Sequence, residues 1–419
     1  MADVRKLQNA DRERWDAYVR ASDLSHFGQL TAWKDLTERA YGVPARWWLA
    51  EEGGRITGVL PLFAKGGRAP QFFSAPGGLL ADSPEIAAAL LEPAREEMRR
   101  RKMAWIELRD QKTAWPGLET NDEHVTMVLT LAENSEAQWK AFDAKLRNQI
   151  RKGEKAGFER KWNRDAATFH RVLLENMRDL GSPIRNVRYY EGALAALGED
   201  AELLVIEREH EAAGVMFTVR HAGTMTDPWA SSLRRFFTHC PNQVLYWEAL
   251  QRAFALGMKR FDFGRSQWNS GTFAFKRQWG AEPVQLHYQY VLGTAKTFPT
   301  LSAQKGSLDT VVQLWKKLPI PVAGFDDQFP ELIVIEDDVT ISFRVTVIVH
   351  DDAKRMDRTQ AGAGDGTVAP VVLKRGCYLG AGACCCRASP SARTPSWPRE
   401  RSSRATCPRA RSWAACPHG

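Results

Sequence analysis

An internal repeat constrains the fold of this chain more than any other feature of its sequence. Residues 45–63, ARWWLAEEGGRITGVLPLF, align without a gap on residues 201–219, AELLVIEREHEAAGVMFTV, at a constant offset of 156. Each copy reads as a strand, a polar turn and a second strand, with Gly58 and Gly214 in register. Two antiparallel hairpins are therefore predicted.

The repeat continues beyond the hairpins. In each copy a helix-like segment runs into a short strand, because residues 84–102 lead into MAWIELRD and residues 242–257 lead into MKRFDFGR. One hairpin can match by chance, but hairpin, helix and strand in the same order and spacing indicate a duplicated unit. We therefore expect an α/β (α+β) protein with two tandem domains, residues 1–140 and residues 141–295.

Composition sets the broad class of the protein. With 44% hydrophobic and 10% aromatic residues, the chain has enough apolar material for two or three packed domains. No run of about 18 apolar residues occurs, and the start MADVRKLQNADRERW lacks the apolar stretch of a signal peptide. Neither a membrane span nor export is predicted, and a cytoplasmic location is expected.

Several catalytic motifs are absent from the sequence before residue 296. There is no G-x-S-x-G elbow, and His239 and Cys240 are adjacent and are interpreted as loop residues. There is no dinucleotide fingerprint and no GxxxxGK[ST] loop for ATP. Nucleophilic hydrolysis is therefore disfavoured, no metal site is expected, and DNA is not an expected partner.

Three blocks of sequence resemble a known family. They are LRNQIRKGEKAGF at 146–158, DLGSPIRNVRYY at 179–190 and FDFGRSQWNSGTFAFKRQWGAEPVQLHYQY at 261–290. Together with the duplicated unit they resemble the FemAB-type aminoacyl ligases and their BioF2-like relatives, and most closely the FemAB-like proteins associated with exosortase and PEP-CTERM loci. The resemblance implies two tandem GNAT-like acyltransferase domains. It also implies acyl or aminoacyl transfer to an amine on a cell-envelope, peptidoglycan or exopolysaccharide precursor.

The chemistry that the resemblance implies leaves the donor open. Amide formation needs a neutral amine, an activated carbonyl beside it and hydrogen-bond donors for the developing oxyanion. Activation must arrive with the donor, either an acyl-CoA or an aminoacyl-tRNA. The sequence lacks the glycine-rich turn of simple acyl-CoA enzymes and also the coiled-coil arm of many Fem ligases. Two alternatives stay open: a non-catalytic module that binds a glycan or lipid-linked sugar, and a hexapeptide-repeat O-acetyltransferase. Peripheral membrane contact and oligomeric state are also left open.

A basic stripe is predicted on one helix. Arg147, Arg151 and Lys155 are spaced at i, i+4 and i+8, with Lys152 beside them, so they share one helical face. By the resemblance, this stripe contacts substrate phosphate or RNA. The alternative is a solvated basic helix that joins the two domains.

The most specific block carries a candidate catalytic lysine. Lys276 follows the alternating aromatic residues Phe273 and Phe275, and this alternation predicts a strand with the aromatic rings on one face. Lys276 and Thr272 are then expected on the other face, toward the substrate cleft. By the resemblance, Lys276 holds a phosphate or stabilises developing negative charge. An exposed surface lysine is the alternative interpretation.

Two further catalytic candidates accompany Lys276. Arg265 follows FDFG and is a candidate for bidentate contact with phosphate or carboxylate, with a purely structural pairing to Asp262 as the alternative. Asp227 and Trp229, in MTDPWA, are expected to line the same cleft. Tyr246 is expected in the core.

The C-terminal region shows a second pattern. From Ile335 the chain divides into hexads, IEDDVT, ISFRVT and VIVHDD, and the pattern resumes later as VAPVVL and KRGCYL. An aliphatic residue every six positions, at Ile335, Ile341 and Val347, resembles the left-handed β-helix of hexapeptide-repeat acyltransferases. We expect a partial β-helix at 331–383, after a linker at 296–330. By this resemblance, His350 is a candidate general base, and an exposed loop histidine is the alternative.

The last residues, 384–419, have a different composition. They hold seven Arg, one Glu and five of the seven Cys, so +6 of the net charge of +8 lies in this tail. The cysteine spacing fits no zinc site, and the Arg, Pro and Ser content predicts disorder. A shifted reading frame can encode a continuation of the hexapeptide pattern, so we interpret the tail as the product of a frameshift near Ala383.

Overall fold

The computed structural model of the chain describes residues 2–66 and 70–297, and short strands between Ile333 and Cys385. By its contacts the chain divides into two units, residues 1–176 with 187–308, and residues 177–186 with 309–419. The helices are α1 (Arg12–Ala21), α2 (Thr31–Tyr41), α3 (Pro84–Arg100), α4 (Ser135–Ala141), α5 (Ala144–Lys155), α6 (Ala166–Leu180), α7 (Val187–Leu197), α8 (Pro241–Ala255) and α9 (Gly271–Arg277), with 3-10 turns η1 (Asn9–Asp11), η2 (Phe27–Gln29), η3 (Gly198–Asp200) and η4 (Arg234–His239).

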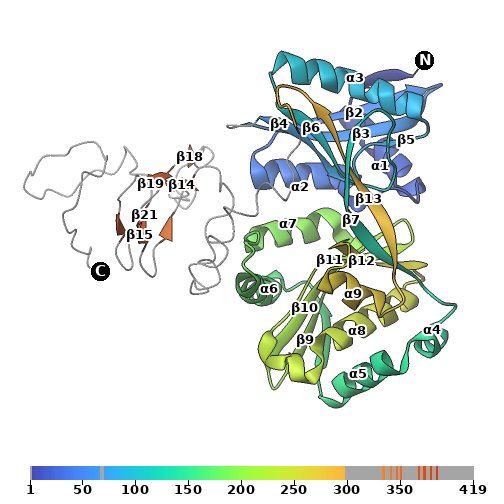
Figure 1. Cartoon of the computed structure of the whole chain (residues 1–419), viewed down its shortest axis with the longest axis vertical. Helices are drawn as coiled ribbons and strands as arrows, with labels where there is room; N and C mark the ends of the chain where they lie inside the picture. Colours follow the sequence, from blue (N-terminus) through green and yellow to red (C-terminus); the bar gives the residue numbers. More distant parts are fainter. Residues whose placement is uncertain are drawn as a thin grey trace, which may run out of the picture. The chain divides into compact units, whose positions relative to one another are not determined.

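One mixed sheet of 13 strands runs through the first unit (Figure 1). Its strand order is β1-β2-β3-β4-β6-β13-β7-β12-β11-β10-β9-β8, and β5 pairs with β3 off this path. The strands are β1 (Asp3–Lys6), β2 (Ala45–Glu52), β3 (Arg55–Lys65), β4 (Gln71–Pro76), β5 (Leu80–Ala81), β6 (Trp105–Gln111), β7 (Glu119–Thr130), β8 (Glu159–Asn163), β9 (Ala201–Arg208), β10 (Glu211–His221), β11 (Thr224–Ser232), β12 (Arg260–Gln267) and β13 (Glu282–Leu292). The predicted mixed α/β fold is confirmed.

The duplicated unit is present in the structure. The first copy consists of the β2–β3 hairpin, β4, α3 and β6, and the second of the β9–β10 hairpin, β11, α8 and β12. In both copies the third strand pairs in parallel with the strand after the helix, β4 with β6 and β11 with β12. The two copies therefore share their connectivity as well as their element order.

The glycines in register at 58 and 214 allow the helix of each copy to approach its hairpin closely. A Cβ atom at Gly58 would lie 2.8 Å from both Ile86 Cγ2 and Leu90 Cδ1 of α3. A Cβ atom at Gly214 would lie 2.9 Å from Leu245 Cδ1 of α8. The same packing requirement therefore explains the same residue in both copies.

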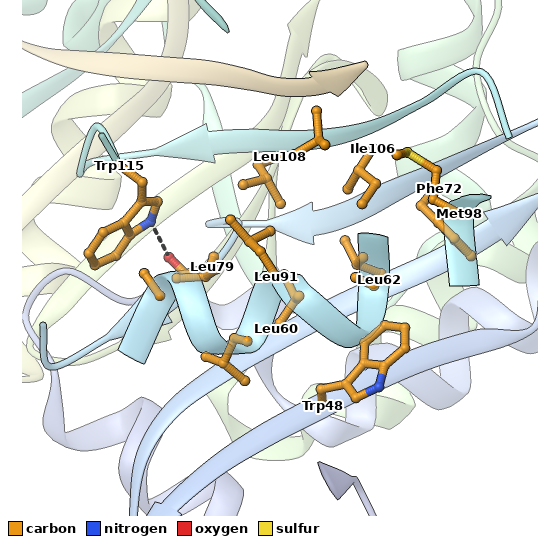
Figure 2. Close-up of a cluster of buried hydrophobic side chains, with 14 of the residues drawn as sticks. Trp48, Leu60, Leu62, Phe72, Leu79, Leu91, Met98, Ile106, Leu108 and Trp115 are labelled. Carbon is orange, nitrogen blue, oxygen red and sulfur yellow. Dashed lines mark hydrogen bonds between the residues drawn. The ribbon is translucent and has the colours of Figure 1, made fainter. Parts of the chain in front are cut away.

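The core of the first copy lies between α3 and the sheet. Figure 2 shows Leu91 and Met98 of α3 over the side chains of the strands, with Leu60, Leu62 and Phe72 among them. Trp115 closes one end of this cluster, and its indole N–H donates to the Leu79 carbonyl at 3.3 Å (Figure 2). This buried apolar area provides most of the driving force for folding of the copy.

Two long strands connect the copies at the centre of the sheet. β7 pairs with β12 of the second copy, while β13 pairs with β6 of the first, and β7 and β13 run antiparallel to each other (Figure 1). The first copy therefore gains β13, which follows the second copy in the sequence, and the second copy gains β7, which follows the first copy. The domain limits at 140 and 295 stay a prediction.

The strands beyond residue 330 form four pairs. β14 (Ile333–Ile335), β15 (Thr340–Ile341) and β16 (Thr346–Val347) pair in parallel with β19 (Val371–Leu373), β20 (Tyr378–Leu379) and β21 (Cys384–Cys385). β17 (His350–Asp351) pairs antiparallel with β18 (Thr367–Val368). β21 falls in the first two residues of the segment for which disorder is predicted. The rest of that tail, with the frameshift, and nearly all of the linker at 296–330 lie outside the described residues.

Within the described part of the chain, no helix combines the length and apolar character that a membrane span requires.

Candidate active site

The second copy opens where its two parallel strands separate. β11 and β12 pair only over Thr224–Thr226 and Arg260–Asp262, although both strands continue. Beyond this point β11 stays paired with β10, and its register shifts so that Thr226 and Trp229 face Val219 and Phe217. The shift is a β-bulge at Asp227 and Pro228, and bulges redirect side chains at such positions. The sequence therefore places Asp227 at the separation of two parallel strands.

Asp227 is a buried carboxylate with one free oxygen. Its side chain is only 5% exposed. The Tyr246 hydroxyl on α8 donates to Oδ2 at 2.7 Å, while Oδ1 has no hydrogen-bond partner among the described residues. Burial raises the pKa of Asp227 to about 7, and the nearby Asp262 adds to this, whereas Lys276 and the Tyr246 hydrogen bond act in the opposite direction. Asp227 can therefore exchange a proton near neutral pH. Tyr246 is buried as predicted, but its contact with Asp227 was not foreseen.

Lys276 lies on a helix, so the predicted strand at Thr272–Lys276 is wrong. The segment forms α9, whose first turn is capped by Ser270, since the Ser270 Oγ accepts from the Phe273 backbone N–H at 3.2 Å. Phe273 and Lys276, three residues apart, are both buried and share one helical face, whereas Thr272 is exposed. The prediction that Lys276 faces away from the aromatic residues therefore fails, and Thr272 does not accompany it.

Lys276 is not a surface lysine. It is 8% exposed, and its Nζ donates to the Gly264 and Arg265 carbonyls, each at 2.9 Å. Burial lowers the pKa of Lys276, against the opposing attraction of Asp227 and Asp262. The pairing of β12 with β7 shifts register between Asp262 and Arg265, which is a bulge in β12. The Lys276 ammonium group therefore fastens α9 to this bulge and supplies positive charge beside two buried carboxylates.

Asp262 is the second buried carboxylate of the site. The Thr126 hydroxyl of β7 and the Gly264 backbone N–H donate to its Oδ1, the latter at 2.8 Å. Burial raises the pKa of Asp262, while Lys112 and Lys276 both favour its charged form. Burial also lowers the pKa of Lys112, which follows β6 in the first copy. Two carboxylates and two lysines with shifted pKa values therefore meet here, and such clusters are typical of functional sites.

Gly264 gives the β12 bulge its shape. Its φ of +73° lies in the left-handed region, and a Cβ atom there would stand 3.3 Å from the Asp227 carbonyl oxygen and 3.7 Å from Asp227 Oδ1. Only glycine permits this backbone without strain and keeps the space beside Asp227 Oδ1.

Arg265 does not pair with Asp262, so that structural alternative is wrong. The Arg265 guanidinium donates to the Tyr288 hydroxyl of β13 and lies 3.9 Å from Asp110 Oδ1, which accepts from the same hydroxyl at 2.6 Å. The Arg265 side chain is 54% exposed. It therefore lies on the accessible side of the bulge, whereas Lys276 lies on the buried side.

Trp229 belongs to an aromatic cluster. Its ring lies edge-on to Tyr190 and Phe217, at centroid distances of 5.2 Å and 5.1 Å. It is half-buried on β11, two residues after Asp227. Trp229 therefore packs within an aromatic cluster, and its place in a substrate cleft stays a prediction.

The predicted basic helix is α5, and it lies against the first turn of α8. A Cβ atom at Gly153 would stand 2.5 Å from Val244 Cγ2 and 3.1 Å from the Cys240 carbonyl oxygen. Lys152 and Lys155 are exposed, and Arg151 is exposed over the Trp139 ring at 5.4 Å, whereas Arg147 is half-buried. The four cations are therefore on a helix, as predicted, and this helix contacts the start of α8 at Gly153. Its role in binding stays a prediction.

The corresponding position in the first copy is closed. Gln29 of η2 donates to the Gly78 carbonyl at 3.1 Å, and Gln111 accepts from the Leu79 backbone N–H at 3.1 Å. Gln111 in turn donates to Gln289 Oε1 at 3.0 Å. These three glutamines are at most 1% exposed. A satisfied network of side-chain amides therefore fills this place in the first copy.

Comparisons with known proteins identify a family model that matches part of the chain and solved structures of similar fold. Residues 140–277 match a family model described as an acetyltransferase (GNAT) domain, and this range contains Asp227, Arg265 and Lys276. The crystal structure of FemX has the same fold, with a TM-score of 0.58 and 18% identity, over 69% of this chain and 97% of that chain.

Two further solved structures are less similar. A tandem GNAT protein from the clavulanic acid biosynthesis pathway has a TM-score of 0.49 and 13% identity, over 71% of this chain and 100% of that chain. The C-terminal domain of a protein from Agrobacterium fabrum that is assigned as a lysylphosphatidylglycerol synthetase has a TM-score of 0.46 and 13% identity, over 72% of this chain and 96% of that chain. No curated protein sequence matches the chain.

Proposed function

We propose that the chain is an acyltransferase that moves an acyl or aminoacyl group from an activated donor to an amine. The observation that carries this proposal is Asp227, a buried carboxylate with a pKa of about 7 and a free Oδ1 where β11 and β12 separate. An attacking amine must lose a proton as its bond to the acyl carbon forms, and a base with a pKa near the working pH accepts that proton most effectively. Asp227 Oδ1 is assigned this role.

The separated strands also offer a place for the donor. Among the described residues, no strand pairs with β11 on its β12 side beyond Thr226, so we assign its backbone groups there to an extended arm of the donor. Lys276 and Arg265 flank the bulge in the neighbouring strand β12, Lys276 on its buried side and Arg265 on its accessible side. We assign Lys276 the task of keeping Asp227 and Asp262 in place, and Arg265 a contact with anionic groups of substrate.

The donor is proposed to carry phosphate, as acyl-CoA and aminoacyl-tRNA both do. Exposed cations on α5 support this, because Arg151, Lys152 and Lys155 have no carboxylate partner among the described residues. Within this proposal the acceptor is an amine of a cell-envelope, peptidoglycan or exopolysaccharide precursor. That choice, and kinship to FemAB and BioF2-like proteins of PEP-CTERM systems, rest on the sequence resemblance.

Reversing the charge of the exposed cations on α5 should weaken donor binding and leave the rate of the chemical step unchanged. The triple variant Arg151→Glu, Lys152→Glu, Lys155→Glu should raise KM for the donor about tenfold or more and leave kcat nearly unchanged, because it removes uniform phosphate binding. Steady-state kinetics at two salt concentrations measure this. Lys140→Glu, on α4 outside the stripe, is the matched control. An unchanged KM for the donor would show that the stripe is a solvated surface.

The function is tested by offering the purified chain both donor classes. Acyl-CoA esters and aminoacyl-tRNAs are each mixed with an amine-bearing peptidoglycan precursor, and mass spectrometry detects the mass that the acceptor gains. We expect amide formation with one donor class, and a rate about a hundredfold lower with Asp227→Asn. Equal product from both proteins would refute the assignment of Asp227. A folded chain that binds the acceptor without consuming either donor would favour the glycan-binding module.

A second candidate function involves the C-terminal strands. The three parallel pairs all have a separation of 38 residues, as between Ile333 and Val371, and successive coils of a left-handed β-helix would produce such a constant separation. This supports a hexapeptide-repeat segment, with His350 as the candidate base for O-acetylation. His350→Ala should then abolish acetyl transfer to a sugar hydroxyl and leave amine acylation unchanged, as measured by product analysis. Unchanged O-acetylation would contradict the assignment.

A further inference from the structure

A surface pocket lies away from the Asp227 site. It has a volume of about 470 Å³ and is formed by the end of β8, by η3 and by residues of β9, β10 and the later turns of α8. Its lining includes Trp162, Arg164, Glu199, Glu202, Arg220 and Arg252. None of these residues belongs to the site between β11 and β12, and the volume is within the range of small-molecule sites.

Two arginines of this pocket are held by backbone carbonyls. Arg164 donates to the carbonyl oxygens of Leu194, Gly198 and Ala201 at 2.5, 2.8 and 2.9 Å. Arg220 donates through Nη2 to the Glu199 carbonyl. A carbonyl oxygen fixes the orientation of a guanidinium group, but because it is neutral it does not cancel the positive charge as a carboxylate would. Because each guanidinium has five N–H donors, both arginines keep donors for another partner.

The two carboxylates of the pocket differ in whether a cation neutralises them. Glu202 forms two hydrogen bonds with Arg252, at 3.0 and 2.7 Å, so this pair is neutral. Glu199 is exposed, and within the described part of the chain no cation lies at ion-pair distance from its carboxylate. Likewise, none of the described carboxylates pairs with Arg164 or Arg220. The pocket therefore presents two guanidinium groups and one carboxylate, each without an opposite charge.

We propose that this pocket binds a small zwitterion of the amino-acid class. The ligand carboxylate would lie on the Arg220 and Arg164 guanidinium groups, and its ammonium group on the Glu199 carboxylate. Charge-assisted hydrogen bonds of this kind are stronger than those between neutral groups. The Trp162 ring, stacked under Arg252 at 5.5 Å, gives the pocket an apolar wall for a side chain of the ligand. The proposal does not depend on the proposed acyltransferase function.

The test uses the full chain and calorimetric titration with the standard amino acids, with acetate and methylammonium as ligands that carry one charge each. We expect at least one amino acid to bind with a dissociation constant of about 1 mM or below, and both half-ligands to bind at least tenfold more weakly. Arg220→Gln and Glu199→Gln should each weaken amino-acid binding about tenfold or more, because each removes one charged partner. Arg39→Gln is the control, because Arg39 lies outside the pocket and likewise donates to a backbone carbonyl, that of Asp35.

Two outcomes would overturn the proposal. If acetate binds as tightly as the best amino acid, and Glu199→Gln tightens its binding, the pocket is a simple anion site. If no amino acid binds at about 10 mM to a chain whose circular dichroism shows it folded, the pocket has no ligand of this class.

Discussion

Replacing Asp227 by asparagine should lower kcat for amine acylation by about a hundredfold or more, which is the usual contribution of a positioned general base. Asparagine has the same shape, and its Oδ1 can still accept the Tyr246 hydroxyl, so the fold should persist. The loss should appear in kcat, because the proton transfer belongs to the chemical step. Initial rates at saturating donor and acceptor measure it.

The same substitution should change how stability depends on pH. The pKa of Asp227 is raised from 3.8 to about 7 in the folded chain, so between these values the folded state holds a proton that the unfolded state releases. Stability of the natural chain should therefore fall as pH rises through this window. Asp227→Asn lacks this loss and should gain about 2 kcal/mol relative to the natural chain between pH 5 and 7. Chemical unfolding at the two pH values checks this.

A matched control separates these effects from a general change of charge. Asp122 is 53% exposed and pairs with His287 on the surface. Asp122→Asn should leave kcat unchanged and should not produce the relative gain in stability. If both variants behaved alike, the assignment of Asp227 would be wrong.

Replacing Lys276 by methionine should destabilise the chain by about 3 kcal/mol or more, because Asp227 then loses the cation that offsets its burial and Asp262 keeps only Lys112. It also removes the donor from the Gly264 and Arg265 carbonyls. Since Lys276 holds the pKa of Asp227 down, that pKa should rise further, and the acidic limb of the rate profile should move to higher pH. Unfolding curves and the pH dependence of kcat measure the two effects.

Arg265→Met provides the comparison. Arg265 is 54% exposed, so its loss should change stability by less than about 1 kcal/mol. Nearly unchanged stability in Lys276→Met would contradict the buried role of Lys276 and would agree with an exposed lysine instead.

The duplicated unit could be predicted because its determinants are local. A hairpin depends on a polar turn between apolar strands, and the glycines at 58 and 214 recur where a helix packs closely on each hairpin. The error at α9 has a local cause too. Phe273 and Phe275 alternate over too few residues to distinguish a strand from a helix. Ser270, three residues before Phe273, is the capping signal that would have indicated the helix.

The partners within the site could not be predicted in the same way. Asp227 meets Tyr246 because a bulge redirects β11 toward α8, and the sequence does not specify that register. Asp262 receives the Thr126 hydroxyl only because β7 crosses to the second copy. The alternation of Phe261, Asp262 and Phe263 would place the carboxylate on the opposite face of the strand from the two rings, and this pattern gives no sign that the carboxylate is buried.

The pH dependence of kcat/KM for amine acylation tests the central claim most directly, because kcat/KM reports the ionisation of groups in the free enzyme. The assignment of Asp227 as the base predicts that kcat/KM shows a transition near pH 7, the pKa of Asp227, with the rate rising as pH rises through it. The small residual rate of Asp227→Asn should show no such transition. A transition near pH 7 that persists in Asp227→Asn would contradict the account, because another group would then accept the proton.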